Sequence, residues 1–155
     1  MNANNHYRSH SCRVLLCAAV IVFMVLLMLP LAAERAQAGP GDVVLVSSDT
    51  AGAQGNNESQ YPRMSSDGRY VVFQSTATNL VTPATTNEQV FRKDLLTGEV
   101  KLCSADIGGV EGNAASFNPV ISSDGRYVAF HSTATNLVAP ATTNWQIFRK
   151  DMLTG

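Results

Sequence analysis

The amino-acid sequence predicts an all-β fold built from two copies of one small antiparallel sheet. Three observations lead to this prediction. The heptapeptide SSDGRYV occurs twice, 57 positions apart. Short runs rich in β-branched and aromatic residues alternate with turn residues after the N-terminal region. No window beyond that region has the 3.6-residue apolar period of an amphipathic helix.

The repeat extends well beyond the heptapeptide. Residues 42–98 align with residues 99–155 without a gap, and 37 of the 57 aligned positions are identical. Identity at this level indicates one structural unit used twice. We therefore expect a first repeat over 42–98 and a second over 99–155, whose last strand is missing because the chain ends.

The N-terminal region has the composition of an export leader. Arg8 and Arg13 precede an uncharged apolar run over 14–33, and Ala36-Gln37-Ala38 has the small-x-small form of a cleavage site. This order is typical of a secretory signal peptide. The run is also long enough to span a bilayer, so residues 1–38 are a signal peptide or an N-terminal hydrophobic helix that anchors the chain. Either way we expect the repeats to be exported: periplasmic, extracellular or membrane-anchored outside the cytoplasm.

Each unit is expected to contribute four short strands, with turn residues between them. Asp67-Gly68 and its copy Asp124-Gly125 predict tight two-residue hairpin turns, and this role accounts for both aspartates without catalysis. The expected strands are 42–47, 61–65, 69–75 and 88–94, and in the second unit 99–104, 118–122, 126–132 and 145–151.

The segments SSDGRYVVFQS and ISSDGRYVAFHS, followed by QVFRKDLLTGE, resemble the WD40-like propeller repeats of TolB-type proteins. The resemblance covers 42–155. It implies β-propeller-type blades of four antiparallel strands, with the Asp-Gly hairpin between the first two strands of a blade. It implies little about function, since such propellers serve as interaction platforms, as domains of peptidases and as exported proteins of other kinds.

Two units leave the expected ring incomplete, because propellers close with about 4 to 8 blades. In a closed ring the first strand completes the last blade, so we expect Asp42–Ser47 to be able to pair with the strand around Phe148. The chain is then either a truncated piece of a longer propeller or one of several copies that assemble into a ring. Its end at a repeat boundary, Gly155, favours truncation.

The composition argues against several kinds of chemistry. The formal net charge is −1, so no basic patch for nucleic acid is expected. The loops ATTNEQ and ATTNWQ hold one carboxylate, Glu88, which is too few for a hard cation, and we predict neither a metal nor a cofactor. Cys103 is the sole cysteine after the leader and is expected to be a buried or half-buried strand residue. No catalytic residue is predicted.

Function is expected where the two copies differ, since identical residues serve what each blade needs. His131 stands opposite Gln74 in the alignment, and Trp145 stands opposite Glu88. These two are the candidate partner contacts, and Trp145 is the better one because tryptophan is enriched at binding hot spots. Packing is the alternative role for Trp145. For His131 the other roles considered are a general base and a polar strand residue on a blade face, and the latter is favoured. The other differing pairs considered are Gln60/Phe117, Tyr61/Asn118 and Arg63/Val120. The repeated FRKD segment, with Arg92 and Asp94 on one strand face, predicts an ion pair between blades.

The leading hypothesis is an exported, non-enzymatic TolB-like β-propeller that serves protein–protein interaction at the cell envelope through an unidentified protein partner. One alternative is a ligand- or glycan-binding propeller assembled from several copies, for which Trp145 is the main evidence. A second is the non-catalytic propeller part of a larger hydrolase.

Overall fold

The computed structural model describes residues 41–155, so the predicted leader over 1–38 lies outside the described residues. The described part is all-β: it contains seven strands in two antiparallel sheets and no helix, as expected. It therefore contains no helix long and apolar enough to cross a membrane.

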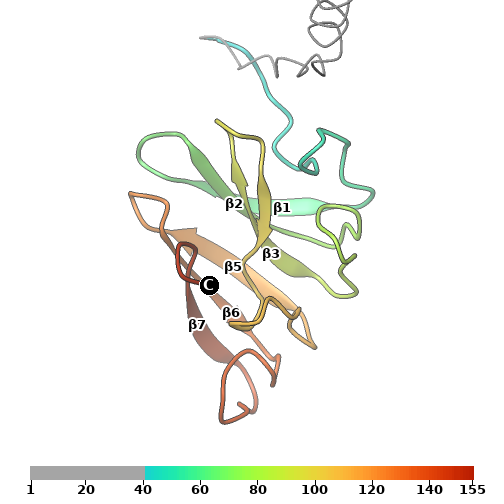
Figure 1. The fold of residues 1–155 in the computed structure, drawn as a ribbon, viewed down its shortest axis with the longest axis vertical. Coiled ribbons are helices and arrows are strands. Elements are labelled where there is room, and N and C mark those ends of the chain that lie inside the picture. The colour runs from blue at the N-terminus through green and yellow to red at the C-terminus, as the bar shows by residue number, and fades with distance from the viewer. Residues whose placement is uncertain (1–40) are drawn as a thin grey trace, which may run out of the picture. The chain divides into compact units, whose positions relative to one another are not determined.

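The first sheet is a four-stranded antiparallel meander, shown in green to yellow in Figure 1. Its order is β1-β2-β3-β4, so each strand pairs with its neighbour in the sequence. Strand β2 pairs with β3 along its full length, from Tyr70 opposite Asp94 to Ser75 opposite Gln89. The bounds are β1 Ser59–Met64, β2 Tyr70–Ser75, β3 Gln89–Asp94 and β4 Val100–Leu102.

The second sheet repeats the first with three strands. Its order is β5-β6-β7, with β5 Ser116–Ile121, β6 Tyr127–Ser132 and β7 Gln146–Asp151. Each strand begins 57 residues after its counterpart in the first sheet, so the sequence repeat is also a structural repeat. The two sheets pack against each other (Figure 1), and they do not form a closed ring.

The prediction of a strand over Asp42–Ser47 is wrong. This segment forms no strand, and only Ser48 makes an isolated bridge, to Gln54. Its counterpart β4 is a strand because the edge of β3 lies beside it. Within residues 41–155 no free strand edge lies beside 42–47, and β7 pairs only with β6, so the expected pairing with the strand at Phe148 is absent.

The SSDG hairpins differ in detail from the predicted two-residue turn. A five-residue connection, Ser65 to Arg69, joins β1 to β2, and the Gly68 N–H donates to the Ser65 carbonyl at 3.0 Å. Only Gly68 has positive φ, at 73°. Glycine is common at this fourth turn position. Asp67 accepts hydrogen bonds from the Ser65 hydroxyl and the Arg69 N–H, which confirms its turn role; Asp124 repeats it.

The predicted ion pair between blades is also wrong. Asp94 binds Arg69, a residue of its own sheet, with Nη2 and Oδ2 2.8 Å apart. Arg92 reaches the second sheet instead, but its Nη1 donates to the Gly125 carbonyl at 2.7 Å. Tyr70 lies between the two arginines, whose guanidinium carbons stand 4.8 Å and 4.4 Å from its ring centre.

An apolar core joins the two sheets. Val72 and Val90 of the first sheet pack with Val128, Phe130 and Phe148 of the second in one buried cluster. In each sheet the paired phenylalanines stack, with ring centres 5.9 Å apart for Phe73–Phe91 and 5.8 Å apart for Phe130–Phe148. Burial of such side chains stabilises a domain by about 2 kcal/mol each, so this cluster fixes how the two sheets meet.

Candidate functional site

One hollow brings together residues from five of the 20 aligned positions at which the two repeats differ. Its volume is about 360 Å³, and we call it the inter-sheet hollow. Nine of its ten lining residues differ from their repeat counterparts, and Thr76 is the exception. Only 20 of the 57 aligned positions differ, so the divergence is concentrated here. The lining residues are Glu58, Gln60, Tyr61, Gln74, Thr76, Glu88, Phe117, Asn118, His131 and Trp145.

A β-bulge on each first strand places side chains at the hollow. The register of β1 against β2 shifts between Gln60 and Arg63, and that of β5 against β6 shifts between Phe117 and Val120. The bulged residues Tyr61 and Asn118 have positive φ, at 54° and 50°. A bulge bends a strand locally and redirects its side chains, and Tyr61 and Asn118 both line the hollow.

Three aromatic rings of the second repeat gather at the hollow. The His131 and Trp145 ring centres lie 5.0 Å apart, and Phe117 stands 5.7 Å from Trp145 and 5.9 Å from His131. Trp145 is nevertheless 57% exposed. The two candidate contact residues predicted from the sequence are therefore neighbours, and one of them presents its ring to solvent.

The first repeat supplies a polar wall. Gln74 Nε2 donates to Glu88 Oε1 at 2.7 Å, and Gln74 Oε1 accepts the Asn118 N–H at 2.8 Å. The amide of Gln74 thus ties both sheets together at the hollow. Asn118 Nδ2 lies 3.1 Å from His131 Nε2, which positions the imidazole beside the same wall.

The lining holds two carboxyl side chains, Glu58 and Glu88, and no lysine or arginine of residues 41–155. Sequence reasoning missed Glu58, although the comparison that selected the other positions would have found it, because its counterpart is Ala115. Of the differing pairs considered from the sequence, only Arg63/Val120 lies outside the lining. Arg63 Nη1 donates to the Pro62 carbonyl at 2.9 Å.

Other reactive groups in residues 41–155 are tied to the fold. Cys103 is fully buried, and burial raises the pKa of its thiol to about 12, so the thiolate is scarce at neutral pH. The described residues hold no cluster of three or more His, Cys, Asp or Glu side chains that would suit a metal ion.

A larger cavity of about 960 Å³ lies among the loops and includes Lys150, Asp151 and Glu111. Its charged side chains bind the protein itself. Lys150 donates to the Ala105 and Asp106 carbonyls, and Glu111 accepts the N–H groups of Thr86 and Asn87. We therefore place the candidate site in the smaller, divergent hollow.

The fold defines a class: an all-β protein of two repeated antiparallel sheets joined by a common core. No protein-family model matches this chain, and no curated protein matches it significantly.

Proposed function

We propose that this chain is an exported, non-enzymatic module of propeller-type repeats, of the TolB-like kind, and that it acts through protein–protein interaction at the cell envelope. The structural repeat and the Asp-Gly hairpins support the propeller-type assignment. The predicted leader supports export. The interaction surface is the side of the second sheet that faces away from the first.

One comparison within the molecule carries this proposal. Strands β3 and β7 have nearly the same sequence, QVFRKD and QIFRKD, yet all six residues of β3 are buried and five of the six in β7 are not. Val90 is 0% exposed, whereas its counterpart Ile147 is 77% exposed. The first sheet is covered on this side by the second sheet. We call the corresponding side of the second sheet the open face: Ala129, His131, Ile147 and Arg149.

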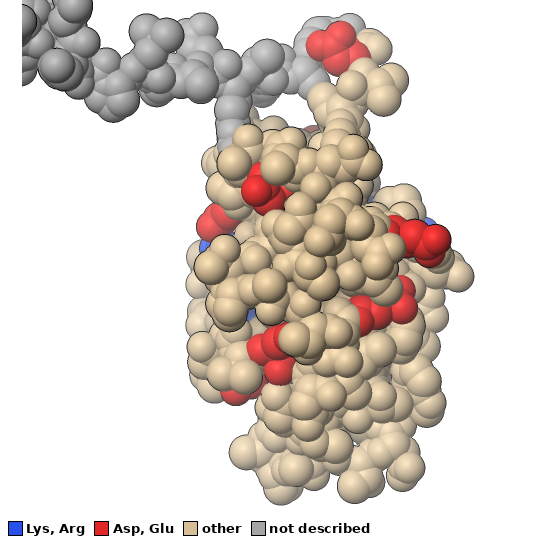
Figure 2. All heavy atoms as spheres, turned by 90° about the vertical axis from the view of Figure 1, so that its right-hand side faces the viewer, with Lys and Arg blue, Asp and Glu red and all other residues tan. Residues whose placement is uncertain are grey.

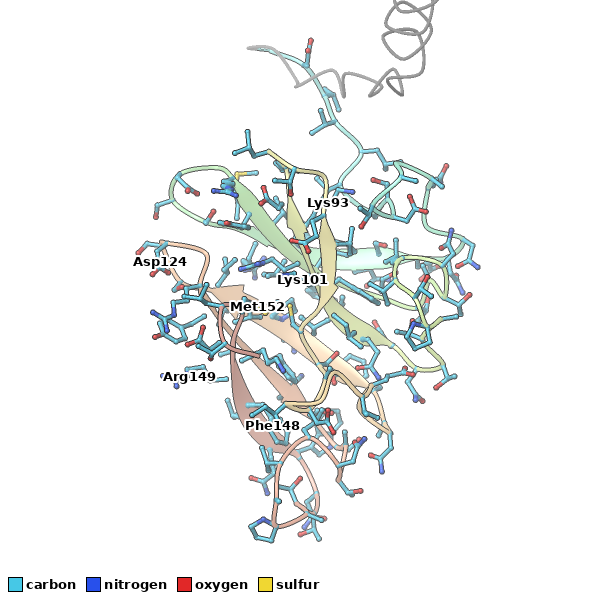
Figure 3. All side chains as sticks on the ribbon, viewed as in Figure 1. Lys93, Lys101, Asp124, Phe148, Arg149 and Met152 are labelled. Atoms are coloured by element: carbon cyan, nitrogen blue, oxygen red, sulfur yellow. The ribbon has the colours of Figure 1, made fainter. Side chains whose placement is uncertain are left out.

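The open face carries polar groups that match those used between the sheets. Arg92 donates to the Gly125 carbonyl of the second repeat. Arg149 stacks on Tyr127 in the same way, 4.7 Å from the ring centre, but no carbonyl acceptor meets its guanidinium among residues 41–155. Figure 3 shows Arg149 at the outer margin of the second sheet, away from the first. An unmatched arginine beside an exposed isoleucine is typical of an interface.

The outer edge of β7, which pairs with no other strand of residues 41–155, defines the partner. In the first sheet β4 pairs with β3 through Phe91–Leu102, Arg92–Lys101 and Lys93–Val100. The sequence repeat gives the equivalent pairs as Phe148–Leu45, Arg149–Val44 and Lys150–Val43. Val43 and Leu45 are 100% and 55% exposed and form no strand in the described structure. A second copy of this chain would therefore add its segment 43–45 to β7, as strand addition to a sheet edge requires.

Disulfide cross-linking tests this register in the full chain, kept in a non-ionic detergent because of its apolar run. Chains carrying V44C are mixed with chains of a different size carrying R149C, both in a background with Cys12→Ser and Cys17→Ser. Paired residues in antiparallel strands lie about 5 Å apart, within the range for a disulfide. We expect mild oxidation to give a covalent heterodimer.

The matched control replaces R149C with Q146C, three positions away on the same strand. Cross-linking of V44C to both positions alike, or to neither, would overturn assembly between copies. If V44C cross-links to neither position, further repeats of a longer chain would be the expected occupant of the open face.

A further inference from the structure

We propose that the inter-sheet hollow binds an organic cation that carries a primary ammonium group. The hollow shares His131 with the open face, but the inference is argued from the lining alone and not from the proposed interaction through the open face. It rests on three features of the lining: carboxylates that pair with no lysine or arginine of residues 41–155, exposed aromatic side chains, and divergence between the two repeats at five of the lining positions.

No lysine or arginine of the described part of the chain pairs with the carboxylates of the hollow. The ion pairs among residues 41–155 are Arg69–Asp94, Lys101–Glu99 and Arg126–Asp151. Glu88 accepts a hydrogen bond from the neutral amide of Gln74, and Glu58 accepts one from Gln60 at 3.2 Å. Two negative charges thus face one small space, and each carboxylate has further lone pairs for an N–H donor.

The aromatic rings supply the second element of cation recognition. All four arginine–aromatic contacts of the described structure involve Tyr70 or Tyr127. Trp145 and Tyr61 are 57% and 50% exposed, so part of each side chain remains accessible to a ligand. A cation over such a ring gains about 0.5 to 2 kcal/mol.

The combination favours a primary ammonium over other ligands. An anion would meet two carboxylates and no lysine or arginine of residues 41–155. A quaternary ammonium would use the rings but would offer no N–H donor to Glu58 and Glu88. On the face in Figure 2, acidic side chains are scattered among uncharged ones and basic ones barely show. The hollow, of about 360 Å³, accommodates the end of a lysine side chain or a small diamine.

Divergence between the repeats supports a role beyond packing. The counterparts of Glu58 and Glu88 are Ala115 and Trp145, and the counterpart of Phe117 is Gln60. If these positions served the fold alone, both repeats could carry the same residues there, as they do at the hairpin and at the Arg69–Asp94 ion pair. The two copies instead bring different side chains to a single space, the carboxylates from the first repeat and the ring cluster from the second.

Trp145 is the only tryptophan of the chain, so its fluorescence reports directly on the hollow. The full chain in detergent is titrated with N-acetyl-lysine amide, with 1,5-diaminopentane and with N-acetyl-norleucine amide, which lacks the ammonium. We expect saturable changes with the first two probes, with dissociation constants on the order of 1 mM, and none with the third. Binding should weaken as salt is raised. A stronger response to lysine amide than to the diamine would identify a peptide side chain as the source.

The E58Q variant provides the decisive comparison, because Glu58 is exposed and its loss leaves the fold intact. We expect affinity for both ammonium probes to fall by about tenfold, which corresponds to one charge-assisted contact. The control is E99Q, which removes an exposed carboxylate outside the lining and should leave affinity unchanged. Equal response to the norleucine probe, unchanged affinity in E58Q, or saturable binding of a neutral oligosaccharide in place of the ammonium probes would each overturn the proposal.

Discussion

At the scale of single residues, the two hairpin glycines share one backbone conformation but differ in their surroundings. Gly68 and Gly125 both have φ of 73°. A Cβ at Gly68 would meet only Met64 Sδ, at 3.8 Å, whereas a Cβ at Gly125 would overlap the ring of Tyr70. The second hairpin therefore packs closely under the first sheet, while the first hairpin is open on that side.

This difference predicts unequal effects of one substitution. G68A should lower the free energy of unfolding by about 1 to 2 kcal/mol, the cost of positive φ for alanine. G125A should cost about 1 to 3 kcal/mol more, because the tyrosine ring must move. Urea unfolding of the two variants measures the difference, and equal losses would contradict the observed packing.

The buried aspartate of the first sheet predicts a pH dependence. Burial alone would raise the pKa of Asp94, but hydrogen bonds from the Arg69 guanidinium and the Leu96 and Thr97 N–H groups outweigh it and lower the pKa to about 2, from 3.8. A lowered folded-state pKa gives stability that is present above the unfolded pKa and is lost as pH falls through the folded value. The window is therefore pH 4 down to pH 2.

Asp94→Asn should accordingly lower the free energy of unfolding by about 2 kcal/mol at pH 6, since the Asp94 side chain is only 7% exposed. The deficit relative to the unsubstituted chain should shrink towards pH 2, where the carboxylate itself is protonated. Unfolding curves at pH 6, 4 and 2.5 test this. A deficit that stays constant over that range would contradict the assignment to Arg69–Asp94.

At the scale of elements, strands β3 and β7 show that one sequence can have two environments. Their side chains repeat almost letter for letter, and β2 and β6 are also nearly identical in sequence. Residues 71–75 of β2 are all buried, whereas β6 alternates between half-buried and buried residues. The pattern predicts strand and face correctly in both copies. It does not predict burial, because burial depends on whether another sheet covers that face.

A paired substitution tests this distinction. V90A should cost about 2 kcal/mol of unfolding free energy, because the Val90 side chain is fully buried between the sheets. I147A, at the equivalent position, should cost less than about 0.5 kcal/mol in the unassociated chain, because Ile147 is exposed. Chemical denaturation at low protein concentration provides the measurement. Similar losses in the two variants would indicate that the open face is already covered.

At the scale of the whole molecule, the sequence predicted much of the architecture and part of the site. The repeat, the all-β class and the hairpin positions follow from local pattern and from internal identity. Comparison of the copies selected His131 and Trp145, which lie together, but it also selected Arg63 and Val120, which lie elsewhere. Distance along the chain does not show which differing positions the bulges at Tyr61 and Asn118 bring to one hollow.

The sequence by itself determined the repeat unit, the period-two strands and the turn residues, because each depends on interactions between residues close along the chain. The tertiary structure decided which of these signals are used. Asp42–Ser47 has a strand-like composition but forms no strand, since a strand needs a neighbouring edge to satisfy its backbone. β7 repeats β3 but stays exposed, since no further sheet within residues 41–155 covers its face. Pairing and burial are properties of neighbours in space, and those neighbours come from distant parts of the chain.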